Sequence, residues 1–428
     1  MKIIEGFELA KPLLSRQAPK EASSADSEEQ VVRQIMDDVR DRGDAALREY
    51  CWKYDDVRLT SLEISPEKIK NARQHVDRDL ISALEFSAGR IRSFHQAQMD
   101  GIRGMVAIPG LDQLIRPLKR VSVNVPSFRA PLPSSLLMTA IPAKVAGVSE
   151  VIVVSPPRKG EEIVSLVTLA AADIAGVDRV FSIGGAQAVA ALAFGTEAIP
   201  RVDKICGPGN IWVTLAKKMV YGVVGIDGIF GTSDVAIIAD ETANPEYCAA
   251  DLLAQAEHDP LASSILITTS RRLVREVGRE IEQQLSDLPR RVIAAESLEN
   301  RGMIAVVASI DEAIGLANLY APEHLCLMIE RAASYVDQVS NAGCIFVGEK
   351  STVVLGDYVV GPSHVLPTGG TARFSSALNV SDFLKFMNVI MVDDASLKKL
   401  GRAAQTMASA EGLEAHARAV AKRLEVLG

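Results

Sequence analysis

Short apolar segments alternate with helical segments through most of the chain. After Lys119 the β-branched and apolar runs 121–125, 151–154 and 179–183 predict strands, and the small-residue segments 134–146 and 161–175 predict helices between them. The predicted strands are mostly apolar and do not alternate regularly with charged residues, which is typical of a parallel sheet with helices on both faces. The same alternation returns between residues 235 and 347. The sequence therefore predicts an α/β protein with two such units.

The two ends of the chain show helical periodicity instead. Apolar residues recur at helical spacing over 27–54, with a break predicted at Gly43–Asp44, and 66–97 predicts a further helix. From Ser381 onward the chain is rich in Ala, Lys and Arg and predicts a helical tail too thin to form its own core. Such a tail commonly packs on a partner subunit.

The composition argues against several classes of protein. The 428 residues carry 46 Lys and Arg against 54 Asp and Glu, and only 5% are aromatic, so we expect no nucleic-acid partner. The apolar runs are shorter than a membrane span, and the first ten residues do not resemble a signal peptide. Five cysteines without a Cys-x-x-Cys pair are interpreted as reduced thiols. We therefore expect a cytoplasmic protein without a membrane partner.

Two glycine-containing turns are candidates for binding a nucleotide. Gly184–Gly185–Ala186–Gln187 follows a predicted strand and opens a helix, and Gly207–Pro208–Gly209–Asn210 precedes another helix. Glycines at such turns let the backbone approach a pyrophosphate, and the helix N-terminus favours its charge. Ordinary tight turns explain such motifs equally well, and no Gly-x-Gly-x-x-Gly follows a strand.

Histidines and carboxylates provide candidates for a metal site and for acid–base chemistry. Gln255 and His258 lie three residues apart on one predicted helix face, and Asp357 and His364 lie on a glycine-punctuated loop. Imidazole and carboxylate are zinc ligands, although a lone histidine is more often a hydrogen-bonded surface group. Glu323–His324 places an acid beside an imidazole, which can exchange protons near neutral pH.

Taken together, these segments resemble histidinol dehydrogenase over nearly the whole chain. The most specific stretches are 251–258, 321–325, 356–368 and 411–416, in that order. The resemblance implies an NAD-dependent, zinc-dependent enzyme that oxidises L-histidinol to L-histidine through bound L-histidinal, with two NAD⁺ consumed, in the last step of histidine biosynthesis.

The family's functional residues carry over to specific positions of this sequence. The resemblance implies zinc ligation by Gln255, His258, Asp357 and, from the partner subunit's tail, His416. It implies substrate contacts by these four together with Ser233, His324, His364 and Glu411. His324 is the implied proton shuttle and Glu323 the water-activating acid. The implied cofactor contacts are Asn124, Gln187 and Asn210.

One segment departs from the family's pattern. Members usually carry an aromatic residue and two glycines where this chain has Asn124–Val125–Pro126–Ser127–Phe128, and Gly-Pro-Ser-Glu appears here as Gly231–Thr232–Ser233–Asp234. Side chains at 127 and 128 would crowd a backbone that glycine leaves open. We therefore expect NAD⁺ to bind differently or more weakly.

The resemblance also implies the architecture. We expect an intertwined homodimer in which each subunit has two incomplete Rossmann-like parallel-sheet domains. The expected division is an N-terminal helical segment over 1–20, a zinc and catalytic domain over 21–123 with 233–381, and an NAD-binding domain over 124–232. A helical tail over 382–428 would complete the partner's active site.

Two alternatives stay open from the sequence. A related zinc and NAD dehydrogenase could act on another polar primary alcohol such as a sulfonated diol, for which Arg129 and Arg373 are the obvious basic candidates. A zinc-retaining, non-catalytic binding protein is the other, although such a protein would have no need of Glu323 and His324. Nucleic-acid binding is set aside, because this chain lacks the basic stripe of a nucleic-acid-binding protein.

Overall fold

The computed structural model describes residues 1–16, 25–102, 108, 110–127, 131–158 and 160–427. The chain divides into two compact units, the first comprising Met1–Met99 with Leu118–Phe383 and the second Asp100–Pro117 with Leu384–Gly428. All five cysteines are free. Among the described helices, none combines the length and the apolar character needed to cross a membrane.

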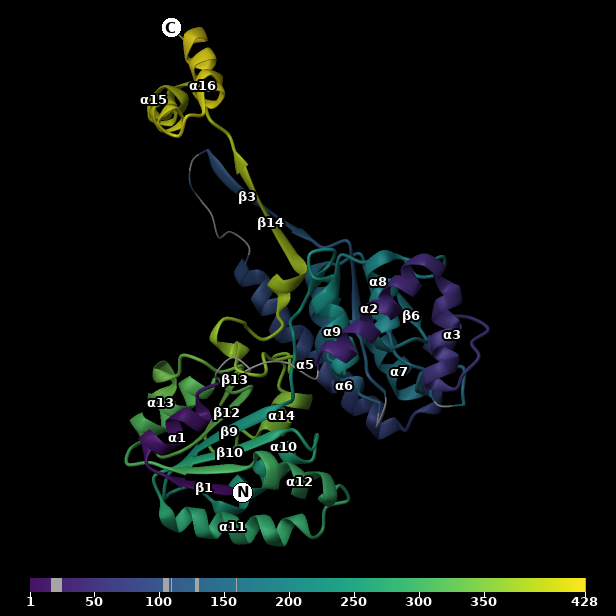
Figure 1. Cartoon of the computed structure of the whole chain (residues 1–428), viewed down its shortest axis with the longest axis vertical. Coiled ribbons are helices and arrows are strands. Elements are labelled where there is room, and N and C mark those ends of the chain that lie inside the picture. Colours follow the sequence, from purple (N-terminus) through teal and green to yellow (C-terminus); the bar gives the residue numbers. More distant parts are fainter. Residues whose placement is uncertain (17–24, 103–107, 109, 128–130, 159, 428) are drawn as a thin grey trace. The chain divides into compact units, whose positions relative to one another are not determined.

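One sheet of the first unit contains six strands, all parallel (Figure 1). Their spatial order is β1 (Lys2–Glu5), β11 (Met303–Val306), β10 (Ser263–Thr268), β9 (Asp234–Ala239), β12 (His324–Met328) and β13 (Cys344–Val347). One face is covered by α10 (Pro245–Ala256), α11 (Arg271–Leu285) and α12 (Arg291–Arg301). The other is covered by α1 (Phe7–Leu14), α13 (Ile310–Tyr320) and the 3-10 turn η2 (Ala332–Gln338). The short helix α14 (Val353–Tyr358) follows β13.

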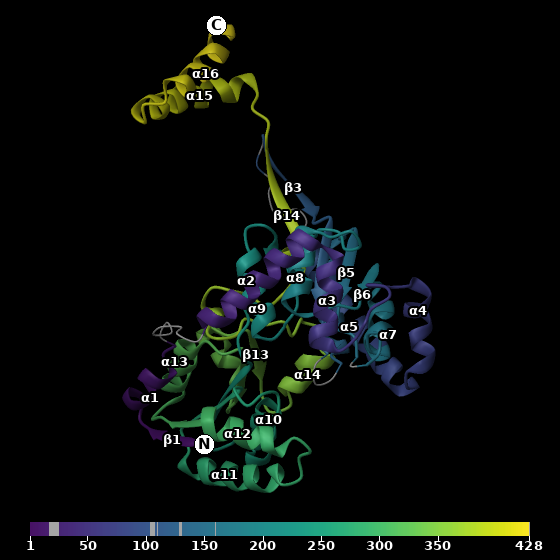
Figure 2. The same cartoon turned by 45° about the vertical axis from the view of Figure 1, so that its right-hand side comes forward.

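The second sheet of this unit, whose strands β5 and β6 are labelled in Figure 2, is parallel except for one edge strand. Its order is β2 (Glu63–Ile64), β6 (Arg179–Phe181), β5 (Glu150–Val154), β4 (Arg120–Asn124), β7 (Lys204–Cys206) and β8 (Gly225–Ile226). An apolar cluster on one face joins it to α2 (Ala25–Arg42), α3 (Asp44–Asp55), α8 (Gly185–Phe194) and α9 (Ile211–Val220). The unit also contains α4 (Pro66–Asn71), η1 (Ala72–His75), α5 (Arg78–Ile102), α6 (Pro133–Ala146), α7 (Leu166–Ala175), η3 (Thr371–Arg373) and η4 (Val380–Phe383).

Both sheets repeat the same strand arrangement. Five parallel strands in each sheet, β9 to β13 and β4 to β8, follow one another along the chain; the first of the five lies in the middle, the next two add on one side, and the last two add on the other. The order 3-2-1-4-5 is that of a Rossmann-like sheet without its sixth strand. The direction in which successive strands are added therefore reverses at the β9–β12 pair in one sheet and at the β4–β7 pair in the other, although both pairs are parallel. The predicted α/β architecture with two parallel sheets is therefore confirmed.

The sheet membership differs from the predicted domain boundaries at the N-terminal side. Residues 27–62 share an apolar cluster with the second sheet, and β2 pairs antiparallel with β6, whereas we expected 21–123 to belong with 233–381. The segment expected to be only helical, 1–20, begins with a strand that extends the first sheet. Helical periodicity predicts which face of a helix is buried but not which sheet it covers, so the sequence did not reveal this packing.

The second unit contains a two-stranded ribbon and two helices. β3 (Leu111–Pro117) pairs antiparallel with β14 (Leu384–Ile390), and α15 (Asp394–Ala410) packs on α16 (Glu414–Val426). Gly401 permits this close approach, because a Cβ there would lie 2.9 Å from a methyl group of Leu424. Apolar side chains remain exposed in this unit, among them Ile390 at 70% and Met407 at 65%. The predicted helical tail is confirmed, although β14 was not predicted within it.

Candidate active site

Glu323 and His324 lie at the amino end of β12, where a tight turn follows α13. Ala321 adopts the left-handed conformation (φ 50°) that ends α13 and turns the chain into the strand. β12 pairs with β9, so that His324 lies beside Val235 and Glu323 beside Asp234. The acid–imidazole pair therefore follows directly on a turn and opens a buried strand.

Main-chain and side-chain groups of β9 and β12 bind one another reciprocally. The Glu323 N–H donates to Asp234 Oδ1 over 2.8 Å, and the Asp234 N–H donates to Glu323 Oε2 over 3.0 Å. Glu323 Oε2 also accepts from Ser233 Oγ over 2.6 Å, and Ser233 Oγ accepts from Gln255 Nε2 over 2.7 Å. The Glu323 carboxylate therefore has a fixed orientation, which a group that positions water requires.

His324 is held in a defined tautomer. Its Nδ1 lies 3.1 Å from the main-chain oxygen of Asp234, which can only accept, so Nδ1 carries a proton. Its Nε2 is buried without a hydrogen-bond partner among the described residues and lies 3.6 Å from Asp357 Oδ1. A neutral His324 therefore presents an unshared electron pair on Nε2, which can accept a proton from a ligand.

Burial and neighbouring charge shift both pKa values. Desolvation raises the pKa of Glu323 above its ordinary value, because a charged carboxylate is less favourable away from water. Burial alone would lower the pKa of His324, but the carboxylates of Glu323 and Asp357 raise it overall. The charge on each of the two groups therefore affects the titration of the other.

The predicted metal-binding residues of the first unit come from separate elements. Gln255 lies in the last turn of α10, which ends at Ala256, so His258 follows the helix rather than sharing its face. Asp357 lies within α14, not on an irregular loop as expected. His364 Nδ1 lies 2.8 Å from the main-chain oxygen of Asp357, which leaves its Nε2 as the free nitrogen. Burial lowers the pKa of His258 and of His364, which favours the neutral form that binds metals.

These groups surround one pocket of about 230 Å³. Of the predicted residues, those that line it are Ser233, His258, Glu323, His324, Asp357 and His364. The opposite wall comes from the second sheet's domain through Leu132, Ser134, Pro208 and Phe230. None of the described lining residues is Lys or Arg.

The described residues of one chain supply only some of the ligands that a zinc ion needs. Among the described residues, no group of three or more His, Cys, Asp and Glu side chains is arranged to hold a metal ion. The neutral imidazole of His258 and the carboxylate of Asp357 nevertheless line the same pocket, and the Gln255 amide donates to Ser233, which also lines it. These nitrogen and oxygen donors fit zinc, with at least one ligand still to be supplied.

The remaining expected ligand and substrate contact belong to the second unit. His416 lies in the first turn of α16, and Glu411 is the residue that ends α15. Both side chains are exposed. Gln255, His258 and Asp357 therefore belong to the first unit, whereas Glu411 and His416 belong to the second unit.

The predicted cofactor residues follow the carboxyl ends of strands in the second sheet. Asn124 ends β4, Gln187 lies in the first turn of α8 after β6, and Asn210 precedes α9 after β7, where its side chain caps the helix through the Val213 N–H. Asn124 Nδ2 donates to Pro208 O over 2.6 Å. β4 and β7 form the reversal point of the sheet, the place where such folds bind nucleotides. Phe128, in the altered segment, and Arg129, a basic candidate for the alternative anionic substrate, lie outside the described residues.

A buried ion pair fixes the loop that follows β7. Lys217 Nζ contacts Asp227 Oδ1 and donates to Gly207 O over 3.1 Å, while Asp227 Oδ2 accepts from the Gly207 N–H over 2.6 Å. The side chains of Lys217 and Asp227 are 2% and 0% exposed. Gly207 has φ +101°, and a Cβ there would lie 2.3 Å from Asn124 O. This cluster was not predicted, because the sequence spacing of its members gives no indication of their contact.

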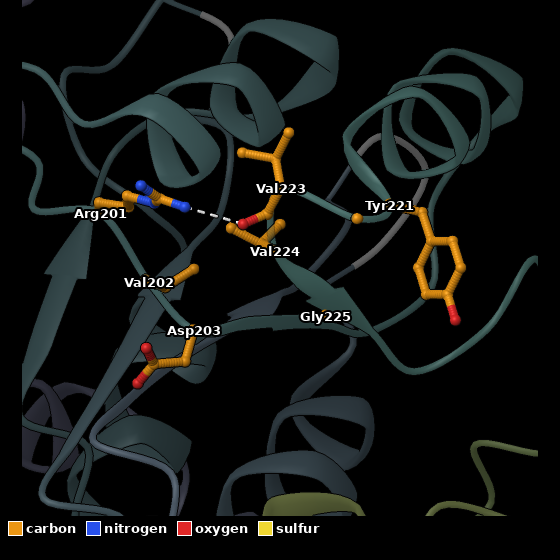
Figure 3. Close-up of a pocket in the computed structure, with 8 residues that line it drawn as sticks. Arg201, Val202, Asp203, Tyr221, Val223, Val224 and Gly225 are labelled. Carbon is orange, nitrogen blue, oxygen red and sulfur yellow. Dashed lines mark hydrogen bonds between the residues drawn. The ribbon is translucent and has the colours of Figure 1, made fainter. Parts of the chain in front are cut away.

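A second, more open depression lies at the amino ends of β7 and β8 (Figure 3). Its two charged side chains already have partners: Arg201 donates to Val223 O over 2.8 Å, and Asp203 accepts from the main chain of Lys119 and Arg120. The described lining residues include no histidine, cysteine or glutamate. The chemistry-bearing residues therefore gather at the first pocket.

The fold and this pocket define an α/β enzyme with a buried acid–imidazole pair and a Rossmann-like second domain. The family model described as histidinol dehydrogenase matches residues 18–424. The histidinol dehydrogenase of Dehalococcoides mccartyi (strain CBDB1) is 53% identical, covering 99% of this chain and 100% of the relative. That of Streptococcus mutans is 48% identical over 92% of each chain.

A solved structure agrees with these sequence matches. The crystal structure of histidinol dehydrogenase from Elizabethkingia anophelis matches with a TM-score of 0.94 at 36% identity, covering 100% of this chain and 98% of that one. The chain belongs to the histidinol dehydrogenase family and is an oxidoreductase.

Proposed function

We propose that this chain oxidises L-histidinol to L-histidine, through bound L-histidinal and with two NAD⁺, in the last step of histidine biosynthesis. The observation that carries the proposal is the buried Glu323–His324 pair, whose free Nε2 opens into a pocket bordered by His258 and Asp357. Conversion of a primary alcohol to a carboxylate removes four electrons as two hydrides and consumes one water. Both steps need a group that accepts protons at the reacting carbon.

The pocket's own residues account for those proton transfers. His324 Nε2 accepts the hydroxyl proton as the first hydride leaves, because its Nδ1 is already committed to Asp234 O. After His324 has released this proton to water, Glu323, oriented by Ser233 and by the Asp234 N–H, positions a water for attack on the aldehyde, and His324 accepts a proton from that water. The resulting gem-diolate then loses the second hydride. The reactive aldehyde stays in a site whose walls come from both domains.

Gln255, His258 and Asp357 would hold a zinc ion, with His416 of the partner subunit as a further ligand. A zinc ion there would anchor the amino and imidazole nitrogens of the substrate, which holds the alcohol carbon in place. Ser233, His364 and Glu411 are the proposed further substrate contacts. Asn124, Gln187 and Asn210 are the proposed NAD⁺ contacts.

A homodimer with shared sites follows from the same proposal. One chain supplies an incomplete ligand set in its first unit, and His416 is exposed in the second. Exposed apolar residues also adjoin Asp357 in α14, with Val354 at 41%, Leu355 at 43% and Tyr358 at 52%. Burial of such side chains together with the exposed apolar residues of the second unit would stabilise a dimer.

The alternative substrate, an anionic sulfonated diol, has less support. Arg373 is exposed and donates to Gly370 O, and it does not line the pocket. Without a described Lys or Arg in the lining, the pocket suits a cationic imidazole substrate better than an anion. A substrate comparison between L-histidinol and a sulfonated diol separates the two.

The test is NADH formation by the purified protein given L-histidinol and NAD⁺. We expect two NADH per histidinol, with loss of the signal after chelation and in His324→Ala. His75→Ala is the matched control, because His75 is exposed in η1 and should retain activity. Absence of NADH from L-histidinol with zinc and NAD⁺ in excess would contradict the proposal.

A further inference from the structure

Arg16 reaches the catalytic end of the first sheet from the N-terminal segment. It lies two residues beyond the end of α1, and its Nη2 donates to Asp234 Oδ2 over 2.6 Å. The Asp234 side chain is 2% exposed and that of Arg16 is 21% exposed. A carboxylate with so little access to water requires a charged partner, and Arg16 is the one that the described structure provides.

Asp234 contacts both members of the acid–imidazole pair. Its Oδ1 accepts from the Glu323 N–H, its own N–H donates to Glu323 Oε2, and its carbonyl oxygen accepts from His324 Nδ1. The side chain thus fixes the turn that carries Glu323, and the main chain fixes the Glu323 carboxylate and the His324 tautomer. With Arg16 on Oδ2, Asp234 is bonded through four separate groups.

The charge of Arg16 also has an electrostatic effect on this site. Asp234 and Glu323 are neighbouring buried carboxylates, and like charges at short range disfavour each other. The guanidinium of Arg16 offsets the charge of Asp234 and so permits Glu323 to ionise beside it. A positive charge at this position therefore supports a Glu323 that acts as a base.

The surroundings of Arg16 hold its side chain in one position. Its guanidinium carbon lies 4.0 Å from the centroid of the Tyr320 ring, and Tyr320 is buried at the end of α13. On the other side, a Cβ at Gly370 would lie 2.7 Å from Arg16 Cδ, so the absence of a side chain there makes room for Arg16. Thr368, two residues before, lines the pocket and accepts from the Gly231 N–H.

We infer that Arg16 is a positioning residue for catalysis, acting through Asp234 to orient Glu323 and His324. The inference rests on the proposed function, since it concerns the same acid–base pair. Nothing in the sequence around Arg16 indicates this role, because the residue lies more than two hundred positions from Asp234 along the chain.

The test measures kcat and KM for L-histidinol, together with zinc content, in Arg16→Ala, Arg16→Lys and Asp234→Asn. We expect kcat to fall about tenfold or more in Arg16→Ala, while KM and zinc content stay within about twofold, because Arg16 contacts neither ligand nor substrate. Arg16→Lys should recover part of the loss, since it keeps the charge but not the planar fork.

Arg179→Ala is the matched control. Arg179 also forms an ion pair with a distant carboxylate, that of Glu63 at the edge of the second sheet; this pair is more exposed (28% and 37%), and neither residue lines the pocket. It should retain the wild-type kcat even if the protein is less stable. A wild-type kcat in Arg16→Ala, or an equal loss in Arg179→Ala, would overturn the inference.

A second measurement separates this inference from the proposed function. If the wild type forms no NADH from L-histidinol, the proposed function fails. The Arg16–Asp234 contact is then judged by a double-mutant cycle on urea unfolding of Arg16→Ala and Asp234→Asn. If the two substitutions change the unfolding free energy non-additively, the Arg16–Asp234 pairing is supported. If their effects simply add, the pairing is absent and the inference is overturned.

Discussion

Replacing Lys217 by methionine is expected to lower severely the unfolding free energy of the domain built on the second sheet of the first unit. The change removes the partner of a carboxylate that is 0% exposed and leaves Gly207 O without its Lys217 donor. Breaking a buried pair from one side typically costs about 3–5 kcal/mol of unfolding free energy. Because whole domains are stable by only about 5–15 kcal/mol, this is a large fraction.

The domain contains its own fluorescent reporters for this measurement. The only two tryptophans are Trp52 in α3 and Trp212 in α9, and both elements cover the second sheet. In a Trp52→Phe background, Trp212 reports unfolding from the helix that carries Lys217. We expect the urea midpoint to fall by about 1 M or more.

Lys218→Met provides the matched control on the same helix. Lys218 is 62% exposed and pairs with Glu29 at the surface, so its loss should cost about 0.5 kcal/mol or less. If Lys217→Met shifted the midpoint no further than Lys218→Met, the argument that this pair holds the Gly207 loop would be refuted.

Two further predictions concern pH and assembly. Burial raises the pKa of Asp55 to about 6, so its contribution to stability is present below its unfolded pKa and is lost as the pH rises through about 6. Asp55→Asn should raise the free energy of unfolding at pH 7 by about 1 kcal/mol, a value that allows for the partial exposure of Asp55. It should also reduce the difference in unfolding free energy between pH 4.5 and pH 7.5. If the variant and the wild type showed the same dependence of unfolding free energy on pH, the ionisation of Asp55 would not be the cause. For the shared site, refolding an equal mixture of inactive Glu323→Gln and His416→Ala chains should restore about a quarter of wild-type activity, because half the dimers then contain one intact site. Activity that stays at the level of the separate variants would contradict a site built from two subunits.

The parts of the fold that follow from local patterns were predictable. The apolar runs of β4, β5 and β9 and the break at Gly43 are visible in the sequence, because buried parallel strands and helix ends have strong local signatures. The ribbon strands β3 and β14 were not predicted, since exposed strands mix polar and apolar residues. Which sheet the helices near the N-terminus cover depends on contacts between distant segments.

The candidate site shows the same division. Glu323, His324, His258 and Asp357 were predicted, and the structure places them around one pocket. Their predicted local structure was less accurate, because the helix before His258 ends earlier and Asp357 is helical. Asp234 was noticed only as a departure from the family's pattern. Its importance comes from the pairing of β9 with β12, which a single sequence does not reveal.

In the first unit, the candidate groups lie at the amino ends of the strands in one sheet and at the carboxyl ends of the strands in the other. The anions concerned are side-chain carboxylates at the first sheet and the phosphates of the proposed NAD⁺ at the second. At the amino edge of the first sheet, main-chain N–H groups of Asp234 and Glu323 hold each other's carboxylates. At the carboxyl edge of the second sheet, helices α8 and α9 begin, and helix N-termini favour phosphate groups. Main-chain groups thus hold the carboxylates of the first sheet, and the N-termini of α8 and α9 would favour the phosphates of the proposed NAD⁺, while no described residue that lines the pocket is lysine or arginine. A site built in this way does not repel a positively charged substrate.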